Sequence, residues 1–154
     1  SNYLFGGGRD MDYRELHYLL LIGFNRSNRE ITKRVYSDNL APGQPKILEF
    51  LLGNNGCTQK EIGRGCALDK STVTSLISRM EDGELIRREA DNKDRRVTRI
   101  YLTELGQKRA KPVKEVYGIV DKAAWGEIPL EERESFMRTF IKIINNLESM
   151  EEDK

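Results

Sequence analysis

The stretch TQKEIGRGCALDKSTVTSLISRMED, residues 58–82, decides the fold. It opens with the pattern T-x-x-E, in which the hydroxyl of Thr58 can accept a hydrogen bond from the amide of Glu61 while the Glu61 carboxylate accepts one from the amide of Thr58. This capping box predicts a short helix over about residues 58–64. The Gly-Arg-Gly run at 63–65 contains poor helix formers, and we expect it to weaken the end of this helix.

A second helix begins after Asp69, a good N-cap, and runs to about Asp82, where Gly83 stops it. Its apolar residues recur with helical spacing and face the core: Val73, Leu76, Ile77 and Met80. Its other side carries hydroxyl and basic groups: Lys70, Ser71, Thr72, Thr74, Ser75, Ser78 and Arg79. Ser and Thr are poor helix formers, so a plain solvated surface explains this side less well than DNA contact does. Short hydroxyls let a helix lie deep in the major groove.

Two short strands, over residues 85–89 and 97–102, predict a β-hairpin after this helix. The hairpin tip is charged, and a narrow minor groove attracts arginine. Asp94 lies two residues before Arg96 and can hold that side chain through an ion pair; a charged, solvated turn is the alternative. The candidate DNA contacts are Thr58, Lys70, Ser71, Thr72, Thr74, Ser75, Arg79, Lys93, Asp94, Arg95 and Arg96.

Further helices are expected on both sides of this region. Residues 12–37 and 45–53 show helical apolar periodicity and are separated by a turn-rich break. A long helix is expected over residues 103–125, and a last helix follows Pro129. We expect this last helix to bury Phe136, Phe140, Ile143, Ile144 and Leu147.

The order of helix, helix, short helix, turn, helix and β-hairpin is that of a winged helix-turn-helix, mainly α with a small β-hairpin wing. Several segments resemble, in the right order, motifs of the MarR family of bacterial and archaeal regulators. The resembling segments are Gln44…Ile47-Leu48…Leu51, LDKSTVT at 68–74, MEDGELIRR at 80–88, the D-x-R of 94–96 and the L-T-x-x-G of 102–106. They cover about residues 42–106, and the flanking helices agree in length and place but not in motif.

The resemblance implies a homodimer whose first and last helices intertwine and whose two winged lobes bind one double-stranded DNA. A two-fold dimer reads two half-sites about 34 Å apart. The expected domain organisation is a flexible tail or cloning remnant at 1–10, a winged DNA-binding lobe at 41–102, and N- and C-terminal dimerisation helices at 11–40 and 103–154. The implied function is transcriptional regulation, specifically repression of transcription by binding to a pseudo-palindromic operator.

Charge is distributed unevenly along the chain, although its formal net charge is only +1. Residues 58–111 carry 13 basic and 9 acidic side chains, whereas residues 112–154 carry 6 basic and 10 acidic ones. A basic segment inside a neutral protein is typical of a local nucleic-acid footprint. No apolar run approaches the roughly 20 residues of a membrane span, so no membrane partner is expected. The first ten residues do not resemble a signal peptide, and we expect a cytoplasmic protein.

The sequence says less about which small molecule or oxidant would control DNA binding. Cys57 and Cys66 flank the short helix about 12 Å apart, too far for an intrachain disulfide, so we expect two inert free thiols, with thiol-based redox sensing as the alternative. Family members often respond to phenolic ligands, and His17, Phe24, Tyr36 and Tyr117 are candidates for a pocket that binds a small aromatic effector; core packing is the other explanation. With one histidine and no ligand cluster, neither a metal nor another cofactor is expected.

Two other classes of function fit the sequence less well. Some winged helices bind proteins, but such a wing has no need of basic residues at its tip beside a hydroxyl-rich helix. An enzyme is not expected, because the sequence contains no Gly-rich phosphate loop, catalytic triad candidate or metal cluster.

Overall fold

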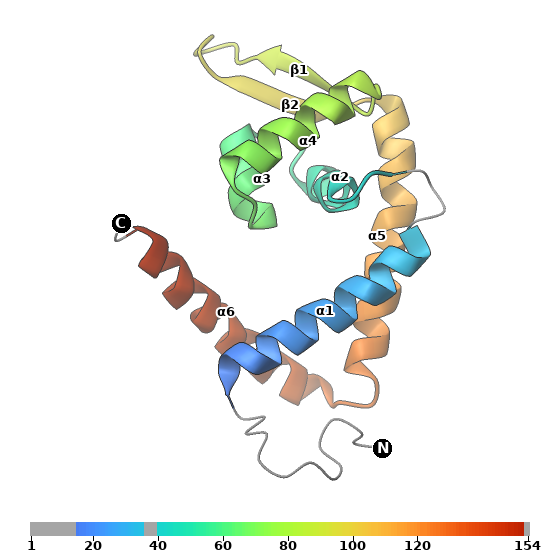
Figure 1. Cartoon of the computed structure of the whole chain (residues 1–154), viewed down its shortest axis with the longest axis vertical. Coiled ribbons are helices and arrows are strands. Elements are labelled where there is room, and N and C mark those ends of the chain that lie inside the picture. Colours follow the sequence, from blue (N-terminus) through green and yellow to red (C-terminus); the bar gives the residue numbers. More distant parts are fainter. Residues whose placement is uncertain (1–14, 36–39, 153–154) are drawn as a thin grey trace. The chain divides into compact units, whose positions relative to one another are not determined.

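The computed structural model describes residues 15–35 and 40–152 (Figure 1). The described elements, in chain order, are α1 (Leu16–Val35), α2 (Gln44–Gly53), α3 (Gln59–Cys66), α4 (Lys70–Asp82), β1 (Ile86–Ala90), β2 (Thr98–Leu102), α5 (Glu104–Trp125) and α6 (Leu130–Glu152). The chain divides into two compact units, one up to Val120 and one from Asp121 onward. A mainly helical chain with one antiparallel hairpin confirms the predicted fold class.

Helix α3 begins as the capping box predicts. The Thr58 hydroxyl accepts from the Glu61 amide at 3.2 Å, and the Glu61 carboxylate accepts from the Thr58 amide at 3.1 Å. The expectation that α3 ends near residue 64 is wrong, because the helix continues to Cys66. Its glycines provide room for neighbours: a Cβ at Gly65 would lie 2.1 Å from the ring of Phe50. Close packing therefore outweighs the low helix propensity of glycine here.

Helix α4 follows a tight turn and packs against α3. Ala67 has a φ of 52°, and the amide of Leu68 donates to the carbonyl of Gly63 at 2.8 Å, which reverses the chain. The carboxylate of Asp69 then accepts from the Thr72 amide at 2.7 Å, as expected of an N-cap. The four predicted apolar residues of α4 are all buried: Val73, Leu76, Ile77 and Met80.

The wing is an antiparallel hairpin in which Ile86 pairs with Leu102 at its base and Ala90 with Thr98 near its tip. The segment before α3 adds a third, one-residue strand that the sequence did not indicate. Its residue Cys57 pairs with Ile100 of β2 through two backbone hydrogen bonds of 2.8 Å, one of them donated by the Gly56 amide. This bridge joins the middle of β2 to the segment just before α3.

The L-T-x-x-G segment joins α5 to the wing. The hydroxyl of Thr103 donates to the carbonyl of Glu84 at 2.6 Å and accepts from the amide of Gly106 at 3.0 Å. A Cβ on Gly106 would lie 1.9 Å from the backbone oxygen of Leu85. Only glycine therefore allows the first turn of α5 to approach the backbone just before β1 this closely.

One apolar core holds α2, α3, α4, the hairpin and the first part of α5 together. Its largest fully buried side chains are Ile47, Leu48, Leu51, Ile62, Val73, Ile77, Met80 and Ile100, and α5 contributes the buried Ala110. Because these residues come from five elements and from both sides of the turn between α3 and α4, the core fixes how α4 and the wing are presented.

Helix α6 lies in the second unit and corrects another expectation. The sequence predicts that α6 buries its apolar residues, but Phe136 is 53% exposed, and Ile144 and Leu147 are exposed as well. Phe140 and Ile143 are only half-buried. The ring of Phe136 contacts Trp125 edge-on at 6.1 Å and stacks on Phe140 at 5.4 Å between centroids. Within its own compact unit, the apolar side of α6 is therefore left largely uncovered.

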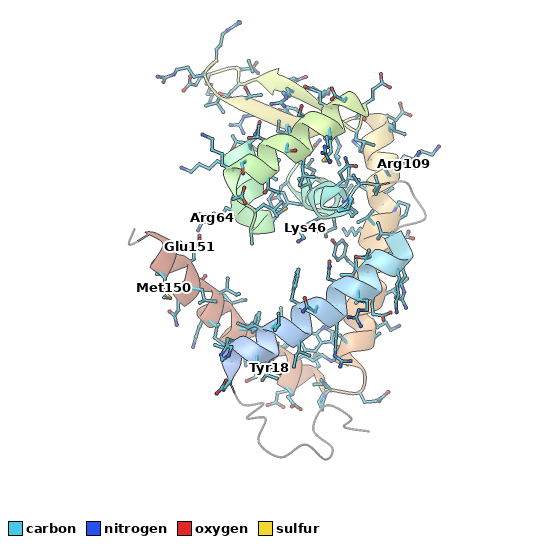
Figure 2. The ribbon with its side chains drawn as sticks, viewed as in Figure 1. Tyr18, Lys46, Arg64, Arg109, Met150 and Glu151 are labelled. Carbon is cyan, nitrogen blue, oxygen red and sulfur yellow. The ribbon has the colours of Figure 1, made fainter. Side chains whose placement is uncertain are left out.

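The apolar side of α6 extends as far as Met150, which lies in the last turn of the helix and is 66% exposed (Figure 2). Within the described ranges, none of the helices combines the length and the apolar character that a membrane crossing requires.

Candidate nucleic-acid interface

The exposed side of α4 forms one continuous open surface. It is lined by Lys70, Ser71, Thr74, Ser75, Ser78 and Arg79. The predicted residue Thr72 is only half-buried and lies at the edge of this surface, beside its N-cap Asp69. Each of the six residues that line this surface carries a hydroxyl or a basic group, and none of the six is acidic.

The hydroxyls of this surface are of two kinds. Ser71 donates to the Asp69 carboxylate at 2.8 Å, and Thr74 donates to the backbone oxygen of Lys70 at 2.9 Å. Across the described chain, no hydrogen bond is made by the hydroxyls of Ser75 or Ser78. These two serines can therefore donate to a ligand, whereas the hydrogens of Ser71 and Thr74 are already used.

Thr58 has a local structural task. Its hydroxyl accepts from the amide of Glu61, and the residue is half-buried at the start of α3. Sequence reasoning counted it among the DNA contacts, whereas its observed bond closes the capping box that starts α3.

At the tip of the wing, an ion pair with Asp94 orients the exposed side chain of Arg96. The Asp94 carboxylate accepts from the backbone amide of Arg96 at 3.0 Å and from its guanidinium at 3.0 and 3.2 Å. The guanidinium of Arg96 holds the pKa of Asp94 below its ordinary value. The Arg96 side chain is still 91% exposed, so the ion pair orients it without burying it. Lys93 and Arg95 are also exposed at the tip, and both are outside the ion pairs found among the described residues.

Asp91 and Arg99 anchor the wing tip, and sequence reasoning missed their roles. The Asp91 carboxylate accepts from the guanidinium of Arg99 at 2.8 Å and from the amides of Lys93 and Asp94 at 3.1 and 3.0 Å. The Arg99 guanidinium also donates to the backbone oxygen of Gly56 at 2.9 Å. An Asp followed by a polar turn is an Asx-turn signal, so the sequence does indicate this site.

The arginines nearer the base of the wing also have partners within the protein. Arg88 donates to the carboxylate of Glu81 at 3.1 Å and to the side-chain oxygen of Gln59 at 3.0 Å. Arg87 pairs with Glu89 and lies 4.6 Å from the ring centroid of Tyr101. The basic charge that the sequence assigns to the wing as a whole is therefore available mainly at Lys93, Arg95 and Arg96.

Three aspartates link the stability of this lobe to pH. Hydrogen bonds lower the pKa of each of them. The main donor is the Thr72 amide for Asp69, the Arg99 guanidinium for Asp91 and the Arg96 guanidinium for Asp94. A carboxyl whose pKa is lower in the folded than in the unfolded state stabilises the fold at any pH above its unfolded-state pKa, which is near 3.8 for Asp. This stabilisation is lost as the pH falls through the folded-state pKa.

We therefore expect the urea midpoint of unfolding to hold from about pH 7 to about pH 5 and to fall below about pH 4. Asp69→Asn keeps a side-chain cap but cannot titrate, so the urea midpoint of this variant should fall less steeply below about pH 4 than that of the unaltered chain. Asp82→Asn, at an exposed carboxyl that caps no helix, should decline as the unaltered chain does. Equal declines in both variants would show that the Asp69 carboxylate does not contribute.

The candidate effector residues are not brought together. Tyr117 is half-buried on α5 and lines a cavity of about 150 Å³ with residues of α1, of the segment before α2 and of α2 itself. His17 is exposed and pairs with Glu15 at 3.5 Å, away from the cavity lining. Phe24 is also exposed, with its ring centroid 5.7 Å from the ammonium of Lys46, and does not line the cavity either. Tyr36 falls outside the described residues.

Both cysteines are free thiols and both are buried, as predicted. Burial raises the pKa of Cys57 and of Cys66 to about 11. At neutral pH a thiol with such a pKa is protonated and therefore a poor nucleophile, which argues against thiol-based sensing. The described residues contain no cluster of three or more metal-ligating side chains.

This lobe defines a class of protein: a winged helix-turn-helix with a polar α4 and a basic wing tip, as in DNA-binding regulators. A model of the MarR family matches residues 38–97. The organic hydroperoxide resistance transcriptional regulator of Bacillus subtilis is 34% identical over 99 residues, which cover 62% of this chain and 67% of that protein. The chain belongs to the MarR family of transcriptional regulators, and it is a DNA-binding regulator rather than an enzyme.

Two further similarities, one to a regulator sequence and one to a solved structure, agree with this family assignment. Transcriptional regulator HosA of Escherichia coli O127:H6 is 28% identical over 107 residues, covering 70% of this chain and 79% of HosA. In structure, the chain is similar to MepR of S. aureus in a MepR–DNA complex, with a TM-score of 0.79 and 20% identity over 89% of this chain and 99% of MepR. The second similarity concerns the fold.

Proposed function

We propose that the chain is a transcriptional repressor that binds a pseudo-palindromic operator as a homodimer in the cytoplasm. In each protomer α4 enters the major groove, and the wing tip at 93–96 enters the adjacent minor groove. The observation that carries this proposal is the pair of exposed polar surfaces on one compact unit. Ser75, Ser78 and Arg79 point outward from α4, while Arg96 is oriented but exposed at the tip.

The charges of the two surfaces suit this arrangement. Lys70 and Arg79 lie at opposite ends of the exposed side of α4, where they can contact phosphates on either side of the groove. A polar surface with free donors can read base edges, whereas a site for a folded protein partner usually has an apolar or aromatic centre. The composition of α4 therefore favours DNA over a protein partner.

A second copy of this chain is the proposed cover for the apolar surface of α6. This helix exposes Phe136, Met137, Ile141, Ile144, Leu147 and Met150, and α1 exposes Leu16, Leu19, Leu21 and Phe24. Apolar patches of this extent are rare on monomers and mark association surfaces. In this proposal, residues 11–40 and 103–154 form the dimerisation region and residues 41–102 form the DNA-binding lobe.

Light scattering tests the dimer and its binding together. We expect a mass about twice the 17.8 kDa of one chain at micromolar concentration, and one dimer on each operator-length duplex. Ile144→Glu places a charge in the apolar surface of α6 and should shift the equilibrium toward the monomer and weaken DNA binding. Lys142→Glu, two residues away at an exposed charged position, is the control. A mass of 17.8 kDa at micromolar concentration would contradict the proposal.

We further propose that a small aromatic acid relieves repression by binding beside Tyr117. A cavity of about 150 Å³ is large enough for one aromatic ring. The ammonium of Lys46, which also lines this cavity, could pair with a carboxylate.

A thermal-shift titration with salicylate tests this part. We expect the melting temperature to rise at millimolar salicylate, because a ligand that binds only the folded state stabilises it. Lys46→Met removes the charge and should abolish the rise, whereas Lys60→Met, on the exposed side of α3, should leave it intact. Absence of any shift at millimolar ligand would count against an aromatic acid.

A further inference from the structure

A chain of polar side chains connects the base of the wing to the exposed side of α4. The Glu81 carboxylate accepts from Arg88 at 3.1 Å, and Arg88 of β1 also donates to the side-chain oxygen of Gln59 at 3.0 Å. The Gln59 amide nitrogen, on α3, donates to the Thr74 hydroxyl at 3.3 Å. Thr74 in turn donates to the backbone oxygen of Lys70 at 2.9 Å. We call these five residues the polar relay.

The direction of every bond in the relay follows from Arg88. A guanidinium has donors and no acceptor, so Gln59 must turn its oxygen toward Arg88. The amide nitrogen of Gln59 then faces Thr74 and can only donate to it. The Thr74 oxygen accepts this bond, and its single hydrogen goes to the Lys70 carbonyl. What remains at Thr74 is one lone pair on an exposed oxygen.

We infer that Thr74 meets DNA as a hydrogen-bond acceptor only, and that Gln59 and Arg88 are positioning residues that impose this polarity. The inference rests on the proposed placement of α4 in the major groove. Donors there are the amino groups of adenine N6 and cytosine N4, whereas guanine, thymine and the phosphates offer acceptors. The base that faces Thr74 therefore carries an amino group. Ser75 and Ser78, whose hydroxyls are free, do not share this restriction.

Selection of bound sequences from random duplex DNA tests the relay with four proteins: the unaltered chain, Thr74→Val, Gln59→Leu and the double variant. We expect adenine or cytosine at one position of each half-site, with this preference lost in Thr74→Val. Gln59→Leu removes the donor that fixes the Thr74 oxygen as an acceptor, so the hydroxyl hydrogen can exchange the Lys70 carbonyl for an acceptor on DNA, and the preference should relax at the same position. The double variant should lose no more than Thr74→Val alone, because both changes act through one hydroxyl.

A matched control and a chemical substitution complete the test. Gln107→Leu makes the same change at an exposed position on α5 and should leave the selected motif unchanged; thermal unfolding verifies that each variant is folded. In the selected operator, adenine is replaced by purine, or cytosine by 2-pyrimidinone, each of which lacks the amino group. Affinity of the unaltered chain should fall about fivefold, the effect of one hydrogen bond, whereas that of Thr74→Val should not change.

The outcomes separate the two proposals. Failure of the unaltered chain to enrich any motif would overturn the proposed function and the relay with it. A clear motif in which Thr74→Val affects a guanine or thymine would overturn the relay alone. So would a Gln59→Leu effect at a different base from the Thr74→Val effect, or additive losses in the double variant.

Discussion

Replacing Gly106 with alanine should unfold the winged lobe more effectively than any other single methyl group added to it. The new Cβ would lie 1.9 Å from the backbone oxygen of Leu85 and 3.1 Å from a methyl group of Leu102. A backbone carbonyl oxygen cannot rotate away as a side chain can, so the start of α5 must move. This movement would also separate the Thr103 hydroxyl from the Glu84 carbonyl. Overpacking of this kind costs about 3 kcal/mol or more.

The same helix provides a matched control for this prediction. Gly118 lies later in α5, and a Cβ there would meet no atom within 4 Å. Gly118→Ala should therefore stabilise the fold by about 0.5–1 kcal/mol, the usual gain for a helix interior. Urea unfolding of both variants measures the difference. If Gly106→Ala were as stable as the unaltered chain, the close approach of α5 to Leu85 would be wrong.

Arg96→Ala should cause the largest loss of DNA affinity among single changes at the wing. The lost side chain is oriented by Asp94 and is 91% exposed, so its removal costs binding without costing core packing. Because the proposed dimer carries two wings, we expect affinity to fall at least about tenfold, similarly for all sequences. The slope of log affinity against log salt should become shallower by about two units, since two cationic contacts are lost.

Two variants check the cause of this loss. Arg29→Ala removes the same charge from the exposed surface of α1 and should leave affinity nearly unchanged. Asp94→Asn removes a negative charge that repels DNA, yet it also weakens the hold on Arg96. If orientation matters, Asp94→Asn should lower affinity rather than raise it. Fluorescence anisotropy with labelled duplex measures all three, and full affinity of Arg96→Ala at moderate salt would refute the wing assignment.

The parts of the fold that the sequence predicts well are those set by neighbouring residues. The T-x-x-E box places the start of α3, Asp69 places the start of α4, and the spacing of Val73 and Met80 shows which side of α4 is buried. The wing follows from alternating β-branched residues. In each case the pattern and its physical cause lie within a few residues of one another.

The parts that it misses depend on distant partners. Arg88 and Gln59 are 29 residues apart, so nothing local shows that this arginine is used inside the protein. The pairing of Cys57 with Ile100 is equally remote. On α6, helical periodicity identifies an apolar side but cannot say what covers it, and Phe136 remains exposed although it packs against Trp125 and Phe140 of the same unit.

The most direct measurement of the central claim is the selection of bound sequences by the unaltered chain from random duplex DNA. The claim is that a two-fold dimer reads DNA with α4 and the wing of each protomer. It predicts an enriched motif made of two inverted half-sites whose centres lie about 34 Å apart, one turn of the double helix. A single asymmetric motif, or no enrichment at all, would contradict it.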